Sequence, residues 1–320
     1  MSGWSSIEIC AGAGGQALGL EQTGFHHVRL VEIDPDACQT LRLNRPLWTV
    51  TAGDVRQFDA TAFRGVDLLA GGVPCPPFSV AGRQLGPEDE RDLFPEALRL
   101  VEETAPRAVL LENVRGILDA RFAEYRAGLL ATLGKMGYVG GWKLLNASDY
   151  GVPQLRPRAI LVAVQAELSD SFSWPDKVSV PPPSVGKCLH DLMAEREWRG
   201  ADAWREQAAG IAPTLVGGSK KHGGPDLGPT RAKRQWAALG VDGNGLADAA
   251  PPPEFTGMPR LTARMTARLQ GFPDSWLFYG RKTAAYRQIG NAFPPPMAAA
   301  VGAQIAECLR IAAGRKVRIA

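Results

Sequence analysis

The sequence lacks the features that mark membrane, secreted and metal-bound proteins. No run of about 18 apolar residues appears, and the N-terminus MSGWSSIEIC has no basic segment followed by an apolar stretch. The five cysteines are far apart and form no Cys-x-x-Cys pair near histidines, so neither a disulfide framework nor a zinc site is expected. We therefore expect a cytoplasmic protein without a membrane segment or a metal.

An excess of charge of one sign is also missing. The 320 residues contain 36 Lys and Arg against 33 Asp and Glu, a net charge of +3. Any site for a polyanion must therefore come from local clustering. A hydrophobic content of 45% with 22% charged residues is ordinary for a folded chain, and the length suits one large domain or two unequal ones.

Short apolar runs alternate with amphipathic stretches over the first half of the chain. The runs are SIEIC, VRLVEID, VDLLAGG, RAVLLENV and RAILVAV, and helix-like stretches such as GQALGLEQTG and PDACQTLRLN lie between them. This rhythm predicts an α/β fold with a doubly wound, Rossmann-like parallel sheet that has helices on both faces.

The rhythm fades after about residue 168. From 174 to 257 the composition changes to Pro, Gly, Ala and scattered charge, with little periodicity. Regular signals return near the C-terminus, where AFPPPMAAAVGAQIAECLRIAAG reads as a helix with proline in its first turn. We predict a catalytic domain at 1–172, completed by 284–320, and a smaller, loop-rich domain at 173–283.

A glycine-rich loop, AGAGG at 11–15, follows the first predicted strand. Glycines there let the backbone turn sharply and approach a ligand closely. Glu32 and Asp54 follow later strands, at the same sheet edge. There Glu32 would accept hydrogen bonds from ribose hydroxyls and Asp54 from an adenine amino group, which favours an adenosine-containing ligand. A plain tight turn, and a helix cap at Asp54, remain the alternatives.

Cys75 lies in a proline-fixed loop, GGVPCPPFS, directly after an apolar run. A thiol at this edge can be exposed and activated, whereas the other four cysteines are expected to be small core hydrophobes. Glu112 ends another apolar run at the same edge, where it could act as a general acid. Arg156 and Arg158 alternate in QLRPR and would share one face of an extended segment, with plain surface charge as the alternative.

These segments together resemble the blocks of the cytosine-C5 DNA methyltransferase family, in the family's order. AGAGG resembles the cofactor loop, VEID the ribose block, and GD at 53–54 the adenine block. GGVPCPPFS resembles the catalytic loop, ENV the acid block, QLRPR the arginine block, and RLTARMTARLQGFPD and QIGNAFPPP the two closing blocks. The resemblance implies a methyltransferase that uses S-adenosylmethionine, of the kind found in bacterial restriction-modification systems.

The resemblance also implies a role for each catalytic residue. Cys75 would add to C6 of a flipped-out cytosine in a specific sequence of double-stranded DNA, after which C5 accepts the methyl group. Glu112 would hydrogen-bond or protonate N3, Arg158 would contact O2, and Arg156 would help to hold the loop and the base. No metal is needed.

The remaining site residues follow from the same resemblance. Those expected to bind the cofactor are Cys10, Ala11, Gly12, Ala13, Gly15, Glu32, Ile33, Asp54, Val55, Pro74, Leu93, Asn291 and Ala292. Those expected to contact DNA are Ser79, Lys220, Lys221, Arg231, Lys233 and Arg234, with the last five in the region where this family carries its target recognition domain. Solvated surface loops are the alternative for that region.

We expect a monomer that acts at the bacterial nucleoid. The sequence leaves open whether it stands alone or is paired with a restriction endonuclease encoded nearby, without a stable complex. Two other classes stay open: a DNA-binding regulator on an inactive methyltransferase scaffold, and an RNA cytosine methyltransferase. The presence of Cys75 and Glu112 argues against the first, and the sizeable recognition region argues against the second.

Overall fold

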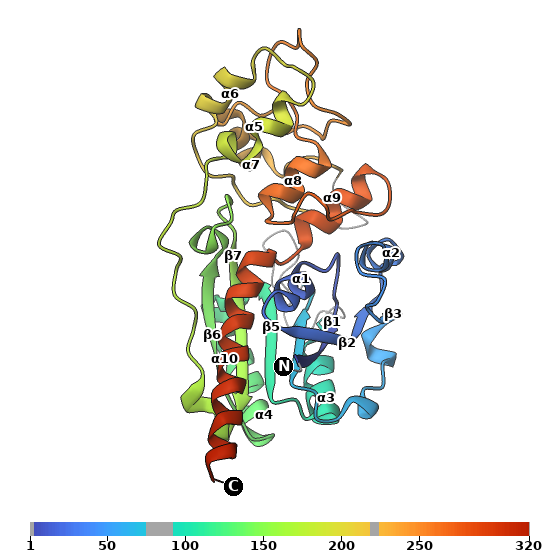
Figure 1. The fold of residues 1–320 in the computed structure, drawn as a ribbon, viewed down its shortest axis with the longest axis vertical. Helices are drawn as coiled ribbons and strands as arrows, with labels where there is room; N and C mark the ends of the chain where they lie inside the picture. Colours follow the sequence, from blue (N-terminus) through green and yellow to red (C-terminus); the bar gives the residue numbers. More distant parts are fainter. Residues whose placement is uncertain (1–2, 75–91, 218–223, 320) are drawn as a thin grey trace. The chain divides into compact units, whose positions relative to one another are not determined.

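A computed structural model describes residues 3–74, 92–217 and 224–319 (Figure 1). The chain divides into two compact units. The first contains Met1–Leu145, Pro157–Asp176 and Ala298–Ala320, and the second contains Asn146–Arg156 and Lys177–Met297. These boundaries do not coincide with the predicted ones, because residues 146–156 and 284–297 belong to the second unit and residues 173–176 to the first. The division into functional domains stays a prediction.

The first unit is built on a seven-stranded mixed sheet with the order β3-β2-β1-β4-β5-β7-β6. Its strands are β1 (Trp4–Ile9), β2 (Phe25–Glu32), β3 (Val50–Ala52), β4 (Leu68–Gly72), β5 (Ala108–Val114), β6 (Tyr138–Asn146) and β7 (Pro157–Gln165). The five apolar runs predicted as strands are confirmed as β1, β2, β4, β5 and β7. From β1 to β3 the chain moves outward, and β4 then pairs with the other side of β1. The order therefore reverses between β1 and β4, where doubly wound sheets bind their ligands.

Helices pack on both faces of this sheet. They are α1 (Gly15–Glu21), α2 (Pro35–Asn44), α3 (Phe94–Thr104), α4 (Ala123–Lys135) and α10 (Pro295–Ile319). Ile7 of β1 joins the core that includes Leu100 of α3 and Leu129 of α4. On the other face, Leu30 of β2 packs with Ala17 and Leu41 from α1 and α2. Alternate side chains of the buried strands therefore serve opposite helical layers, as the α/β prediction requires.

One edge of the sheet differs from the prediction. The expectation of an all-parallel sheet is wrong there, because β7 runs antiparallel to β5. The connection 147–156 between β6 and β7 is too short for a crossover helix, so the chain returns in the opposite direction. Strand β6 was not predicted, since it is largely exposed and contains two glycines instead of an apolar run. Gly140 is needed for close packing: a side chain there would lie 2.5 Å from Cβ of Ala163.

The second unit has a core of its own. Its helices are α5 (Val185–Ala194), α6 (Ala201–Gln207), α7 (Thr230–Ala238), α8 (Ala263–Leu269) and α9 (Lys282–Asn291). Trp198, Trp204 and Trp236 are buried together in this core. The expectation of a loop-rich region thus missed α5, α6 and α7, which have 10, 7 and 9 residues. Helices this short show too few turns for apolar periodicity to be recognised.

Helix α10 accounts for the most apolar helical stretch of the described chain. Residues 282–314 are, by length and composition, apolar enough to cross a membrane. However, Val301, Ile305 and Leu309 form a fully buried stripe on one side of α10. A side chain at Gly302 would meet Leu20 at 2.9 Å, so α10 packs closely against the end of α1. An amphipathic core helix has this pattern, and burial explains the apolar stripe.

Candidate functional site

The loop between β1 and α1 lies where the strand order reverses. Cys10, Gly12 and Gly14 have positive φ angles of 51°, 55° and 81°. Glycine adopts such angles at little cost, which explains two of the three residues. The N–H of Ala11 donates to the carbonyl oxygen of Val31 at 3.2 Å and ties the loop to β2. The backbone therefore turns sharply at the sheet edge, as the glycine pattern predicted.

Glu32, at the end of β2, fastens this loop. Its Oε2 accepts a hydrogen bond from the N–H of Gly12 at 2.7 Å, and its Oε1 accepts one from the N–H of Asp34 at 2.7 Å. Burial raises the pKa of Glu32, and these two N–H groups oppose that shift. A carboxylate has about four acceptor positions, so both oxygens can also accept from a ligand. The ribose contact of Glu32 stays a prediction.

Glu8, on β1, is a buried carboxyl group to which the sequence pattern gave no role. It is only 1% exposed. Burial raises the pKa of Glu8 well above its usual value, and the charge of Glu32 raises it further. A protonated Glu8 is uncharged, so it does not add a second negative charge near Glu32. The signal was present in the sequence as one acidic residue inside the apolar run SIEIC.

The surroundings of the loop suit an adenosine-containing group. Among the described atoms, none lies within 4 Å of the position that a side chain would take at Gly12 or Gly53. A ligand could therefore approach the backbone at both glycines. Ile33 is 66% exposed and offers an apolar surface at the end of β2. Asp54 accepts from the N–H of Arg56 and so caps a short turn; its adenine contact stays a prediction beside that structural role.

The other predicted cofactor residues of the first unit differ in exposure. Ala13, Val55 and Leu93 are buried, and Val55 and Leu93 belong to the hydrophobic core between the sheet and α3. Cys10 and Pro74 are half-buried. If the cofactor binds here, the exposed surface of Ile33 and the half-buried residues are better placed to touch it than the core residues.

A buried ion pair lies at the carboxyl end of β5. Nε of Arg158 is 2.6 Å from Oε1 of Glu112, and the two side chains are 9% and 6% exposed. The contact is an ion pair rather than an aligned hydrogen bond. In the antiparallel register Arg158 is opposite Val114, two residues from Glu112, so both side chains are on the same face of the sheet. The structure thus brings together two of the four predicted catalytic residues.

Cys75 and Ser79 lie outside the described residues, but the chain that leads to them is described. Gly72, the last residue of β4, pairs in parallel register with Glu112. Asn113 is fully buried, and its Nδ2 donates to the carbonyl oxygen of Val73 at 3.4 Å. The segment that leads into the Cys75 loop therefore begins next to Glu112. A contact between Cys75 and Glu112 stays a prediction.

The remaining four cysteines do not have the character of nucleophiles. All four are free thiols. Burial raises the pKa of Cys10, and it raises the pKa of Cys38 and Cys188 to about 11. The Sγ of Cys308 is buried and donates to the carbonyl oxygen of Leu168 at 3.4 Å. Thiols of raised pKa are protonated at neutral pH and react slowly, which supports the choice of Cys75.

Arg156 belongs to the second unit and is fully buried. Its guanidinium donates to the carbonyl oxygens of Leu215, Gly290 and Ala292 at 2.8, 2.8 and 2.9 Å. Arg156 therefore holds the backbone on both sides of Asn291, an exposed residue at the end of α9. The predicted contact of Arg156 with the base, and those of Asn291 and Ala292 with the cofactor, stay predictions.

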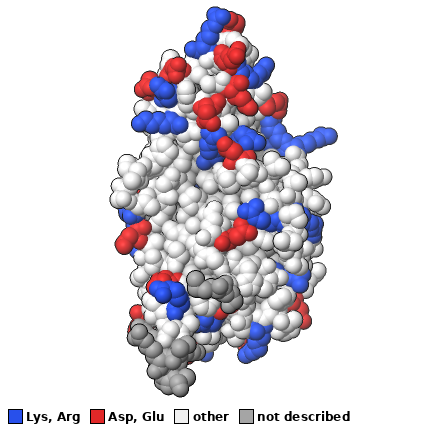
Figure 2. Space-filling model, in the orientation of Figure 1, with Lys and Arg blue, Asp and Glu red and all other residues white. Residues whose placement is uncertain are grey.

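Three of the predicted DNA-reading residues lie on α7. Arg231 and Arg234 are exposed and three positions apart, so they share one side of the helix. Lys233 Nζ forms an ion pair with Asp226 at 2.9 Å. Lys220 and Lys221 lie outside the described residues. On the face shown in Figure 2, charges of both signs are interspersed over the second unit. DNA binding on that face would depend on individual side chains rather than on a field of one sign.

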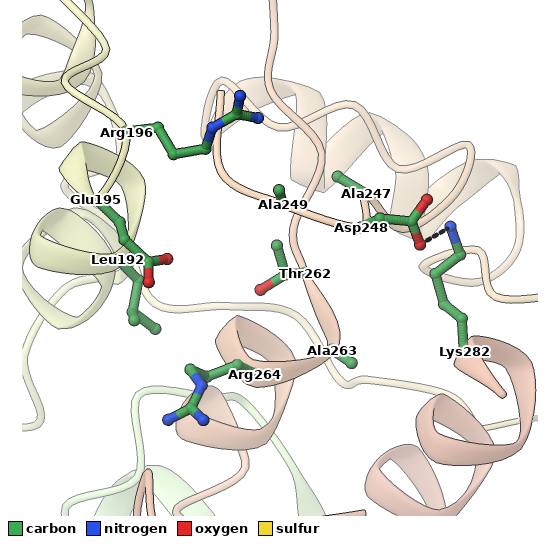
Figure 3. A pocket seen from close by; sticks show the side chains of 10 residues that line it. All are labelled: Leu192, Glu195, Arg196, Ala247, Asp248, Ala249, Thr262, Ala263, Arg264 and Lys282. Atoms are coloured by element: carbon green, nitrogen blue, oxygen red, sulfur yellow. Dashed lines mark hydrogen bonds and ion pairs between the residues drawn. The ribbon is translucent and has the colours of Figure 1, made fainter. Parts of the chain in front are cut away.

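A hollow of about 620 Å³ in the second unit does not coincide with these residues. It is lined by side chains that include Glu195, Arg196, Arg264 and Lys282 (Figure 3). Nζ of Lys282 is paired with Oδ1 of Asp248 at 2.8 Å on its rim. Opposite charges that already neutralise each other give no preference for a charged ligand, so we assign no ligand to this hollow.

Comparison with protein families gives a match over nearly the whole chain. Residues 4–307 match the family model described as C-5 cytosine-specific DNA methylase. The chain is 58% identical over 310 residues to the Type II methyltransferase M.NgoMIV of Neisseria gonorrhoeae, covering 96% of this chain and 98% of that protein. It is 57% identical to the Type II methyltransferase M.NaeI of Lentzea aerocolonigenes, covering 95% of this chain and 75% of that protein.

Solved structures resemble the fold at lower sequence identity. A Spodoptera frugiperda DNMT2 variant superposes with a TM-score of 0.64 at 18% identity, over 97% of this chain and 99% of that one. The S. pombe Dnmt2 methyltransferase has a TM-score of 0.63 at 19% identity, over 96% and 99% of the two chains. At these identities the likeness concerns the fold alone.

Proposed function

The chain belongs to the C-5 cytosine-specific DNA methylase family and is a DNA (cytosine-5-)-methyltransferase, and on this premise we propose how it works. It transfers a methyl group from S-adenosylmethionine to C5 of a cytosine that is flipped out of double-stranded DNA, through a covalent adduct of Cys75. The observation that carries this proposal is the buried pair of Glu112 and Arg158, at the sheet edge where Gly72 leads into the Cys75 loop.

The chemistry assigns one task to each residue. The thiolate of Cys75 adds to C6 of the cytosine, and the electron pair of the C5–C6 double bond becomes available at C5. Glu112 hydrogen-bonds or protonates N3, and Arg158 contacts O2, so that the charge that develops in the ring is stabilised. C5 then forms its bond to the methyl group as the bond between that methyl group and sulfur breaks, which leaves S-adenosylhomocysteine. Loss of the C5 proton to a base restores the double bond and releases Cys75.

The cofactor residues are those of the loop after β1 and the ends of the neighbouring strands. When bound, S-adenosylmethionine supplies the electrophilic methyl group. Glu32 would accept from the ribose hydroxyls, Asp54 from the adenine amino group, and Ile33 would cover the adenine ring. The open backbone at Gly12 and Gly53 supports this arrangement, because no side chain of the described residues lies within 4 Å of either position.

DNA recognition is proposed for the region 173–283, whose greater part, from 174 to 257, contains none of the family's blocks. Flipping the target costs a few kcal/mol of unstacking and unpairing that contacts with DNA have to offset. Arg231 and Arg234 are proposed to read guanine edges, because a guanidinium pairs bidentately with O6 and N7. The names of the relatives, Type II methyltransferases, support a role in restriction-modification. That the protein is a cytoplasmic monomer acting at the nucleoid is part of the proposal.

The adduct gives the direct test of this mechanism. Wild-type protein with S-adenosylmethionine should form a denaturation-resistant complex with DNA that contains 5-fluorocytosine, since fluorine cannot leave as the C5 proton does. Cys75→Ala should form no adduct and lose methyl transfer, while calorimetry finds normal cofactor binding. An adduct with Cys75→Ala, or turnover above a few per cent of wild type, would contradict the role of Cys75.

The same assay separates the rival functions. Methylation is measured on DNA and on tRNA side by side. Transfer to DNA supports the proposal, transfer to tRNA alone would identify an RNA methyltransferase, and specific DNA binding without transfer would identify a regulator. Bisulfite sequencing of DNA from cells that express the protein then gives the recognition sequence.

A further inference from the structure

Three buried polar side chains of the second unit form one network. Gln154, Arg156 and Gln270 are each 0% exposed. Nε2 of Gln154 donates to Oε1 of Gln270 at 2.7 Å, and Nη1 of Arg156 approaches Oε1 of Gln154 at 3.5 Å. Buried polar groups carry a high cost unless they are hydrogen-bonded, so such a network specifies one arrangement of the backbone around it.

One end of the network holds the turn that follows α9. Nη2 of Arg156 donates to the carbonyl oxygens of Gly290 and Ala292, and Nε2 of Gln270 donates to Ala292 as well, at 2.5 Å. Three hydrogen bonds thus fix the peptide groups on both sides of Asn291. All three bonds end on backbone carbonyl oxygens. They fix the backbone that carries Asn291 and do not involve its exposed side chain.

The other end holds Leu215. Its N–H donates to Oε1 of Gln154 at 2.9 Å, and its carbonyl oxygen accepts from Nη1 of Arg156 at 2.8 Å. Two residues later, the chain touches the turn directly. A side chain at Gly217 would collide with the carbonyl oxygen of Arg287 and would lie 2.6 Å from Oδ1 of Asn291. The segment that ends at Gly217 and the turn at Asn291 therefore rest on each other.

We propose that Gln270, together with Gln154 and Arg156, is a positioning residue that couples cofactor binding at Asn291 to discrimination between DNA sequences. The segment Thr214–Gly217 lies within the region 173–283 proposed for DNA recognition, and the same three side chains set both its path and that of the Asn291 turn. A shift of one surface therefore shifts the other. The inference rests on the proposed function, which assigns Asn291 to the cofactor and this region to DNA.

The test replaces Gln270 by methionine, which fills a similar volume without hydrogen-bonding to Ala292. The matched control is Thr266→Val on α8: Thr266 is also fully buried, but its hydroxyl donates only to Ala263 within one turn, at 2.8 Å. We expect Gln270→Met to raise the Kd for S-adenosylmethionine about tenfold, because the hydrogen bonds of Gln270 with Ala292 and Gln154 are both lost and the turn at Asn291 is no longer fixed. It should also reduce about tenfold the kcat/KM ratio between the mapped duplex and one with a single changed base pair.

The value of kcat with saturating cofactor and mapped duplex should change less than twofold, and Thr266→Val should leave both readouts at wild type. The proposal is overturned if Gln270→Met behaves like Thr266→Val, or if only one of the two readouts changes. The wild-type protein is measured first. A wild type that does not bind S-adenosylmethionine refutes the proposed function, whereas normal wild-type binding with an unaffected Gln270→Met refutes the coupling.

Discussion

Two buried arginines, two positions apart in the chain, have different kinds of partner in the two units. In the first unit, Arg158 lies 2.6 Å from the carboxylate of Glu112. In the second, Arg156 donates to three backbone carbonyl oxygens. A carboxylate and a guanidinium can each exchange partners for a polar ligand, whereas carbonyl oxygens fixed in the backbone cannot move away independently. The Glu112–Arg158 pair is therefore suited to chemistry, whereas Arg156 is suited to fixing the backbone.

The two regions also differ in how they are built. At the sheet edge, the strand register brings Gly72 next to Glu112 and places Arg158 on the same face. In the second unit, buried side chains connect segments that are distant in sequence, as Gln154 and Gln270 do. Changes at the sheet edge should therefore alter reaction rates, and changes in the network should alter affinities and stability.

Glu112→Gln provides the strongest test of this difference. We expect kcat to fall by about 10²–10⁴-fold, the usual contribution of a positioned acid, because an amide cannot protonate N3. The Kd for S-adenosylmethionine should stay close to wild type, whereas the melting temperature should fall, because Arg158 loses its buried countercharge. Glu96→Gln is the matched control, since Glu96 also forms an ion pair with an arginine, Arg99, at 2.8 Å on α3. Weaker cofactor binding with a normal kcat would contradict the comparison.

The second prediction concerns His27, a buried polar residue of the first unit that should affect the stability of the fold rather than the reaction. His27 bridges Ser6 and the carbonyl oxygen of Ala17, with Nδ1 2.8 Å from Ser6 Oγ and Nε2 2.9 Å from that oxygen. Burial lowers the pKa of His27 to about 4. Between about pH 6.5 and 4 the unfolded chain therefore binds a proton that the folded one does not, and about 3 kcal/mol of stability should be lost as the pH falls.

Urea unfolding of wild type and His27→Gln at several pH values measures this loss. The glutamine amide can donate to Ala17 in place of the ring but does not titrate, so the variant should lose less stability than wild type on acidification. Glu8 and Glu32 have raised pKa values and act in the opposite direction, so the difference between the two proteins is the quantity to compare. The exposed neighbour His26→Gln is the control. Parallel pH curves for all three would show that His27 carries no such linkage.

The residues at the sheet edge could be predicted from the sequence because the patterns that indicate them are local. Apolar runs indicate buried strands, and the ends of parallel strands converge, so the positions of Glu32 and Glu112 after such runs were enough to assign both to one edge. The glycine pattern indicated the sharp turn of the loop, in which Gly12 and Gly14 have positive φ angles. The family's blocks then supplied roles for these residues that spacing alone could not.

The network of the second unit could not be predicted in the same way. Alternation in QLRPR placed both arginines on one face, yet Arg156 forms its hydrogen bonds with residues up to 136 positions away. No local pattern encodes which distant carbonyl oxygens a buried guanidinium will meet. The partnership of Gln154 with Gln270 depends on the packing of α8, and β6 was missed because an exposed edge strand has no apolar run. Long-range contacts decide such features.

The smallest expected effect concerns α7 in the second unit, whose basic side chains are either exposed or paired with a carboxylate. Arg231 and Arg234 are exposed, whereas Lys233 is paired with Asp226 at 2.9 Å. Changing the arginine that reads guanine to alanine should cost about 1–3 kcal/mol at one base position. Lys233→Ala should weaken binding to all sequences alike and lower the salt slope by less than the value of about 1 expected for a free phosphate contact, because Asp226 already neutralises part of its charge. Titration of matched and singly substituted duplexes at several salt concentrations measures both effects. If the three alanine variants keep wild-type affinity, salt dependence and sequence preference, α7 is solvated surface. DNA recognition would then have to lie on another surface of the second unit.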